Sequence, residues 1–68
     1  MKLLITGASS ILGKNLTKEL LKIENISIRI LEHDTPVKIE NCQTLKADIQ
    51  DAESMIKICS GIDVVIHL

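Results

Sequence analysis

Residues 2–13 read KLLITGASSILG, and this stretch decides the fold class. Its first half, residues 2–6, holds the apolar run LLI and stops at a glycine, as a buried central strand does. The residues after that glycine are small and turn-forming, and Ser9 or Ser10 can cap a helix that begins directly behind them. A buried strand that turns at a glycine into a helix is the first half of a βα unit.

Two helices are expected from the spacing of apolar residues. The first is predicted to end near Asn25, and its apolar positions recur at spacings of four, four and three: Leu12, Leu16, Leu20 and Ile23. The second is predicted between Asp51, which can cap it, and Gly61, which suits its C-terminal end. Its apolar face is predicted to consist of Ala52, Met55, Ile56 and Cys59.

Three further segments are predicted to be strands. Residues 26–32 are β-branched and alternating, residues 44–47 form a short third strand, and residues 63–68 form a fourth with Val64–Ile66 as its buried run. The resulting order is strand, helix, strand, strand, helix, strand. Such alternation predicts an α/β fold with a parallel sheet and right-handed crossovers.

The composition excludes several classes of function. The 68 residues contain no Phe, Tyr or Trp, so no phenol is available as an acid or base and no aromatic ring can stack on a nucleic-acid base. The net charge of −1 also argues against a nucleic-acid partner. The longest apolar runs, such as Leu3–Ile5, are far shorter than the roughly 20 residues of a membrane span, and we expect a cytoplasmic chain without a membrane partner. Cys42 and Cys59 lack metal-ligand spacing and are interpreted as small buried hydrophobic residues, so no metal site is predicted.

The loop between the first strand and the first helix carries the candidate site. In a doubly wound α/β fold, the pyrophosphate of a dinucleotide lies at this position. Gly7 permits the tight turn, and Gly13 allows the helix to pack closely on the strand. Backbone N–H groups near Ile11 and Leu12 would face the phosphates. Ser10 or Ile11 stands where glycine-rich fingerprints have a middle glycine, although the Ser10 hydroxyl could bond a phosphate oxygen; the alternative is a turn that needs only small residues.

Glu32 ends the second strand, 19 residues after Gly13. A carboxylate about 20 residues beyond the loop can accept both ribose hydroxyls of adenosine and would repel a 2′-phosphate, which favours NAD over NADP. His33 could lie beside that phosphate if the cofactor were NADP, but a solvated loop histidine is the simpler interpretation. The alternative for Glu32 is an exposed charge at a strand end.

Two further positions follow strand ends. At Asp48 a carboxylate can accept the amino group of adenine, while Ile49 packs on the base; the alternative for Asp48 is a loop or helix-entry residue. His67 could be a metal ligand or an acid–base group, but no second His or Cys is placed to join it. A packed, hydrogen-bonded histidine at the strand end is therefore the favoured interpretation.

Taken in order, these pieces resemble the extended short-chain dehydrogenases/reductases, the family of NAD-dependent sugar-nucleotide epimerases and dehydratases. The resemblance covers all 68 residues. It depends on LITGA and LG in the loop (4–8 and 12–13), I-L-E at 30–32, ADI at 47–49 followed by Asp51, and GIDVVIHL at 61–68. The last stretch is the most specific, because the fourth strand of this family typically reads D-V-V-I-H-L.

The resemblance implies the N-terminal part of a Rossmann domain, with about four parallel strands in the order 3-2-1-4 and two flanking helices. It assigns cofactor contacts as follows: Gly7, Ser10, Ile11, Leu12 and Gly13 to the pyrophosphate, Glu32 to the adenosine ribose, Asp48 and Ile49 to adenine, and Leu68 to the segment beside the nicotinamide ribose. No catalytic residue is predicted, because the Tyr-x-x-x-Lys pair and the sugar-nucleotide part of the family are expected beyond Leu68.

Two alternatives stay open. The chain could be a non-enzymatic module of the same fold, a dinucleotide sensor or an interaction module that pairs through the open edge of its fourth strand. It could also be an unrelated α/β domain without a dinucleotide site. In the favoured interpretation the chain is the NAD-binding part of an epimerase- or dehydratase-like oxidoreductase, and a sugar nucleotide is a partner only of the longer parent.

Overall fold

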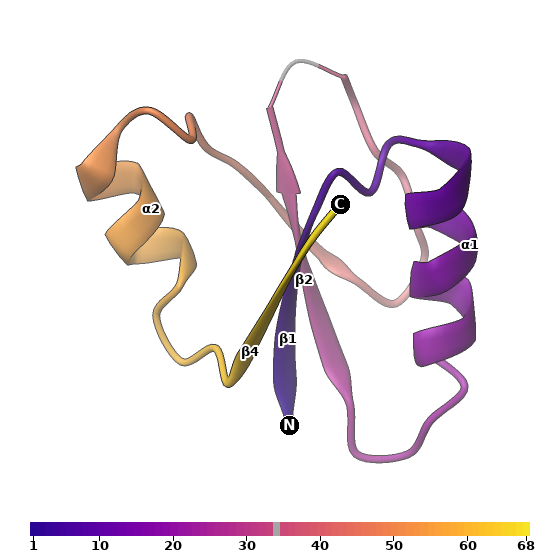
Figure 1. Cartoon of the computed structure of the whole chain (residues 1–68). Coiled ribbons are helices and arrows are strands. Elements are labelled where there is room, and N and C mark those ends of the chain that lie inside the picture. Colours follow the sequence, from indigo (N-terminus) through magenta and orange to yellow (C-terminus); the bar gives the residue numbers. More distant parts are fainter. Residues whose placement is uncertain (34) are drawn as a thin grey trace.

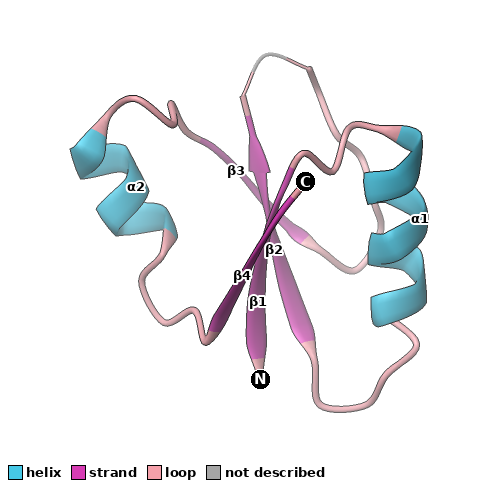
Figure 2. Ribbon diagram, in the orientation of Figure 1, coloured by secondary structure: helices cyan, strands magenta, loops and turns pink. Residues whose placement is uncertain are grey.

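Four parallel strands form one sheet in the order β3-β2-β1-β4, with one helix on each face (Figures 1 and 2). The computed structural model describes residues 1–33 and 35–68. The elements follow the predicted order: β1 (Lys2–Thr6), α1 (Ile11–Leu20), β2 (Ser27–Glu32), β3 (Gln43–Lys46), α2 (Ala52–Ile58) and β4 (Val64–His67). The predicted fold class and strand order are therefore confirmed, and the predicted strand limits differ from the observed ones by at most one residue at either end.

β1 is the centre of the molecule, because it pairs with both β2 and β4. Its side chains alternate between the two faces of the sheet. Ile5 packs with Ile30 of β2 in the cluster on the α1 side, and Leu4 packs with Leu31 and Ile58 in the cluster on the α2 side. The continuous apolar run of β1 thus reflects a strand that is covered on both faces.

The predicted apolar face of α1 is wrong in two of its four positions. Leu12 is 69% exposed, and Ile23, which is 52% exposed, lies beyond the end of the helix. The residues of α1 that are buried are Gly13 and Thr17. Thr17 Oγ1 donates to Gly13 O at 2.7 Å, so its hydroxyl needs no water. The helix turns its smallest side chains toward the sheet because it lies too close to admit larger ones there.

The second half of the fold is more exposed than the pattern predicts. Ile56, placed on the buried face, is 74% exposed, and the buried residue of α2 is Ile58. Val64 and Val65, predicted as a buried run, are 43% and 51% exposed. They lie on an edge strand, whose outer side has no neighbour among the strands that the structure describes. Apolar composition alone does not distinguish such an edge from a covered strand.

The N-terminal caps of both helices are residues that the sequence predicts as caps. Ser10 caps α1 and Asp51 caps α2. Asn25, where α1 is predicted to end, lies five residues beyond its last residue and adopts a positive φ of 65° in the turn that leads to β2. Gly61, with φ 75°, likewise lies in the turn after α2.

Both cysteines are free, and although predicted to be buried they are half-buried and pack against the two core clusters. Burial raises the pKa of the Cys42 thiol, which favours the uncharged form. Within residues 1–33 and 35–68, no cluster of three or more metal-ligating side chains is present. No helix in the described part of the chain is long and apolar enough to cross a membrane.

Candidate functional site

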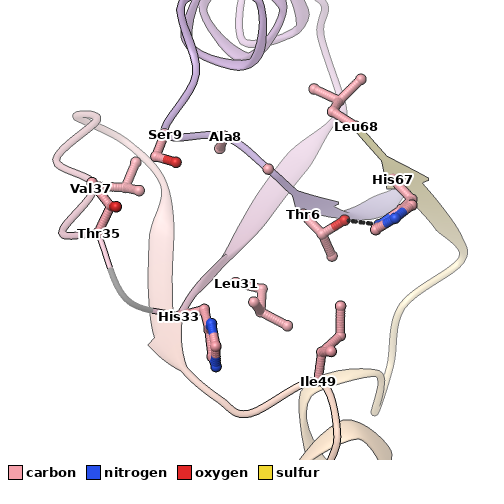
Figure 3. A pocket seen from close by; sticks show the side chains of 11 residues that line it. Thr6, Ala8, Ser9, Leu31, His33, Thr35, Val37, Ile49, His67 and Leu68 are labelled. Atoms are coloured by element: carbon pink, nitrogen blue, oxygen red, sulfur yellow. Dashed lines mark hydrogen bonds between the residues drawn. The ribbon is translucent and has the colours of Figure 1, made fainter.

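A pocket of about 320 Å³ opens at the carboxyl ends of the strands (Figure 3). We call it the carboxyl-edge pocket. Its lining comes from the β1–α1 loop, the segment after β2, the segment after β3 and the end of β4: Thr6, Gly7, Ala8, Ser9, Leu31, His33, Thr35, Val37, Ile49, His67 and Leu68. In doubly wound α/β proteins, ligands bind at this edge of the sheet, where the strand order reverses. Here the reversal lies between β1 and β4.

Two glycines shape the β1–α1 loop beside the pocket. Gly7 has φ 78°, and a Cβ there would lie 2.7 Å from Leu68 O. A Cβ on Gly13 would lie 2.4 Å from Gly7 O and 2.7 Å from the Cα of Ala8. The predictions that Gly7 permits a tight turn and that Gly13 permits close helix packing are therefore confirmed. The loop brings the N-terminus of α1 to the end of β1, where unpaired helix N–H groups favour anions.

Ser10 uses its hydroxyl within the loop. Its Oγ donates to Gly7 O and accepts from the N–H of Gly13, both at 3.0 Å. A hydroxyl has one proton, so in this arrangement Ser10 has none to donate to a phosphate oxygen. Ile11 and Leu12 follow as the first two residues of α1, and their side chains are exposed. Residues 10–13 adjoin the carboxyl-edge pocket but do not line it.

Glu32 contacts the chain that follows it. Its Oε2 accepts from the N–H of Val37 at 3.1 Å, which holds this buried valine in place as part of the pocket lining. Glu32 itself is half-buried and does not line the pocket. An ionised carboxylate has about four acceptor positions, so the bond to Val37 leaves Glu32 able to accept from further donors. The sequence predicts Glu32 as a ligand-binding residue but does not predict this contact with Val37.

Of the two predicted adenine residues, which follow β3, Ile49 lines the pocket and Asp48 does not. Ile49 is 49% exposed, so that its side chain presents an apolar surface to a ligand. Asp48 Oδ1 accepts from the N–H of Gln50 at 2.9 Å and lies 3.7 Å from His33 Nε2. His33, interpreted as a solvated loop histidine, is exposed but also lines the pocket.

The β4 side of the pocket is formed by His67 and Leu68. His67 Nδ1 and Thr6 Oγ1 are 2.5 Å apart, and the N–H of Leu68 donates to Thr6 O at 3.1 Å. His67 is hydrogen-bonded at the strand end, as predicted, but the prediction that it is packed is wrong, because the residue is exposed. Thr6 was not among the predicted site residues. Its place in the pocket lining and its pairing with His67 in the β1–β4 register, neither of which the sequence contains, identify it.

Comparisons with known proteins give consistent results. A sequence profile of the 3-beta hydroxysteroid dehydrogenase/isomerase family matches residues 4–68. Uncharacterized proteins of Mycobacterium tuberculosis and Mycobacterium bovis are 34% identical over 67 residues, a match that covers 98% of this chain and 8% of theirs.

Solved structures with the same fold include dehydrogenases. Uronate dehydrogenase from Agrobacterium tumefaciens superposes with a TM-score of 0.82 at 26% identity, covering 98% of this chain and 25% of that chain. A variant of that enzyme, solved in complex with NAD, superposes equally well. A short-chain dehydrogenase family protein from Francisella tularensis shares the fold, with a TM-score of 0.71, 22% identity and coverage of 98% and 30%.

Proposed function

The chain belongs to the extended short-chain dehydrogenases/reductases, in the 3-beta hydroxysteroid dehydrogenase/isomerase family, and from this membership we propose that residues 1–68 bind NAD. The observation that carries the proposal is the β1–α1 loop. A Cβ at Gly7 would collide with Leu68 and one at Gly13 with Gly7 and Ala8, so both glycines are needed for the turn that brings the N-terminus of α1, a favourable place for a pyrophosphate, to the edge of the pocket. The group therefore fits the residues that are present.

The proposed contacts follow the cofactor from one end of the site to the other. The pyrophosphate lies against the loop, where the N–H groups of Ile11 and Leu12 donate, and Ser10 with the two loop glycines holds the turn. Glu32 accepts from the adenosine ribose. Adenine packs on Ile49 and donates to Asp48, and Leu68 begins the segment beside the nicotinamide ribose.

NAD is proposed over NADP because of Glu32. A carboxylate accepts from the 2′-hydroxyl of NAD but repels the 2′-phosphate of NADP at the same place. The uronate dehydrogenase variant in complex with NAD supports the choice of cofactor class.

For the whole protein, we propose a nicotinamide-dependent oxidoreductase of the epimerase or dehydratase type that acts on a sugar nucleotide in the cytoplasm. The chain spans 8% of the length of the mycobacterial relatives and 25% of the uronate dehydrogenase chain. NAD supplies a hydride acceptor in this class of reaction. The 68 residues contain no Tyr to serve as the family's general base, so the activity proposed for them is binding and not turnover.

The test is calorimetric titration of the chain with NAD and with NADP. We expect NAD to bind at least about tenfold more tightly, and Glu32→Gln to narrow that ratio because it removes the repulsive charge. Glu40→Gln is the matched control, since Glu40 is an exposed carboxylate outside the pocket lining and its neutralisation should leave the ratio unchanged. Equal or tighter binding of NADP would contradict the Glu32 assignment, and failure to bind either dinucleotide would contradict the proposed function.

A second candidate function is association through the sheet edge. Val64 and Val65 are successive residues of the edge strand β4, so they point to opposite faces, and both are about half exposed. An uncharged apolar strand with a free edge is a surface on which another strand can add. We therefore propose self-association through β4 as an alternative role.

A further inference from the structure

Thr6 and His67 form a hydrogen-bonded pair across the carboxyl ends of β1 and β4. They are register partners, so their side chains leave the same face of the sheet, and Thr6 Oγ1 lies 2.5 Å from His67 Nδ1 (Figure 3). Thr6 is 4% exposed, which leaves its hydroxyl little access to water. The backbone beside the imidazole is also held, because Leu68 N–H donates to Thr6 O. The ring of His67 is thus positioned through one of its two nitrogens.

The second nitrogen, Nε2, is the one of interest. When the Thr6 hydroxyl donates to Nδ1, the neutral imidazole carries its proton on Nε2, which makes that atom a donor. In the part of the chain that the structure describes, Nδ1 is the ring nitrogen that bonds to the protein. With the proton on Nε2, His67, which lines the carboxyl-edge pocket, presents a donor to a ligand there.

The described lining of the pocket contains no charged Lys, Arg, Asp or Glu side chain, so a donor from an imidazole matters for binding an anion. Of the residues that the structure describes around the pocket, the polar side chains are three hydroxyls and two imidazoles. The other imidazole, that of His33, lies 3.7 Å from the Asp48 carboxylate. A dinucleotide is an anion rich in oxygen acceptors. His67 is therefore the ring in this lining that has no carboxylate within ion-pair distance among the described residues.

We propose that His67 is a further cofactor-binding residue: its Nε2–H donates to an oxygen of the bound dinucleotide on the β4 side of the carboxyl-edge pocket. Thr6 is the positioning residue that orients the ring for this contact. The inference rests on the NAD binding proposed above. A phosphate oxygen and a ribose hydroxyl oxygen accept such a bond by the same chemistry, and the experiment below separates them.

Two substitutions of His67 test the roles of its two ring nitrogens separately. His67→Asn places an amide near the position of Nδ1 and retains the partner of Thr6, but it offers nothing at Nε2. His67→Gln places an amide nitrogen near Nε2. We expect His67→Asn to weaken NAD binding about tenfold in calorimetric titration, and His67→Gln to stay within about threefold of the natural chain. Circular dichroism and thermal unfolding would establish that both variants fold.

The positioning role of Thr6 has its own pair of variants. Thr6→Val keeps the shape of the side chain but removes the hydroxyl, and we expect it to weaken NAD binding severalfold. Thr6→Ser restores the hydroxyl and should restore the affinity. A Thr6 that acts only in strand packing would give the opposite ranking, since valine suits a strand at least as well as serine.

The same titrations with ADP locate the accepting oxygen. Equal losses for ADP and NAD in His67→Asn would place it on the adenosine diphosphate half, whereas a loss for NAD alone would place it on the nicotinamide ribose. Addition of NAD should also shift the Nε2 signal of His67 in nitrogen NMR spectra of histidine-labelled chain. If the natural chain binds NAD and His67→Asn binds it equally well, the proposal is overturned while the proposed function stands. If the natural chain binds no NAD, both are overturned.

Discussion

The two helices meet the sheet by different means. On one face of the sheet lies α1 (Figure 2). It approaches so closely that Gly13 has no room for a Cβ beside Gly7 and Ala8, and Thr17 is fully buried. On the other face, α2 contributes one buried residue, Ile58. Backbone carbonyls at and just after the C-terminal end of α2 accept hydrogen bonds from Arg29 of β2.

This difference shows how the fold is held beside its site. The α1 contact brings backbone atoms close together at Gly13 and adds Leu20 against the core, so the loop that turns at the carboxyl edge has little room to change. The α2 contact consists of the buried Ile58 side chain and the hydrogen bonds from Arg29. On that half of the molecule Ile56, Val64 and Val65 are exposed. At Gly13 the α1 contact therefore has no room for a larger side chain, whereas the α2 contact depends on Ile58, with Met55 beside it, and on Arg29.

The largest effect is expected at Gly13. Gly13→Ala gains about 1 kcal/mol of helix propensity but forces a Cβ to within 2.4 Å of Gly7 O, a backbone atom that cannot move alone. We expect a net loss of at least about 3 kcal/mol in the free energy of unfolding, most of what a domain of this size has. Urea denaturation followed by circular dichroism would measure it.

Gly61 supplies the matched control for Gly13. It has φ 75° but nothing within 4 Å of an added Cβ, so Gly61→Ala should cost only about 1 kcal/mol, from backbone strain alone. Equal losses of unfolding free energy in Gly13→Ala and Gly61→Ala would show that the close packing of α1 at Gly13 does not contribute specially to stability.

A smaller effect is expected at Arg29. Its Nη1 donates to Ile58 O at 2.6 Å and to Ser60 O at 2.9 Å, and its Nε donates to Gln43 Oε1 at 2.8 Å. Arg29→Met retains much of the apolar stem and leaves the carbonyls at the end of α2 without this donor. We expect a loss of about 2 kcal/mol in the same urea experiment.

Arg29→Lys separates charge from geometry at this position. A lysine keeps the favourable charge at the helix C-terminus, but one ammonium cannot reproduce the fork that reaches both α2 and Gln43. We expect it to recover about half of the loss. Unchanged stability in Arg29→Met would show that Ile58 alone suffices to hold α2.

The smallest effect on stability, and a direct effect on assembly, is expected at the β4 edge. Val65→Lys places a charge on a residue that is 51% exposed, so the fold should change little while association through β4 weakens about tenfold. Sedimentation velocity over a range of concentrations would measure this. Ile56→Lys is the control, because Ile56 is 74% exposed on α2 and lies outside the edge. A natural chain that stays monomeric throughout would contradict association through β4.

The elements themselves could be predicted from the sequence, but their buried faces could not. Leu12 and Leu20 are both leucines at predicted apolar positions of α1, yet Leu12 is exposed and Leu20 packs against the core. Helical periodicity identifies which residues share a face but not which face the sheet covers. In α1 the buried face is the one that carries Gly13, because the close approach of two backbones needs the smallest residue there.

The site shows the same division. Gly7 and Gly13 were predicted for the reasons that the structure confirms, since each reason is local to the loop. The partners of Glu32 and His67 were not predicted. Glu32 accepts from a backbone N–H five residues later, and His67 bonds to Thr6, 61 residues away. The roles of these residues toward NAD stay predictions.

The sequence by itself determined the order of strands and helices, the parallel α/β class and the position of the glycine turn, because strand and helix periods and backbone sterics act over a few residues. The strand order 3-2-1-4 was implied by the family resemblance, whereas the tertiary structure decided the register of the strand pairs and that Thr6 faces His67. Those outcomes depend on which strands pair and in which register. Pairing brings together residues whose separation along the chain carries no information about their distance in space.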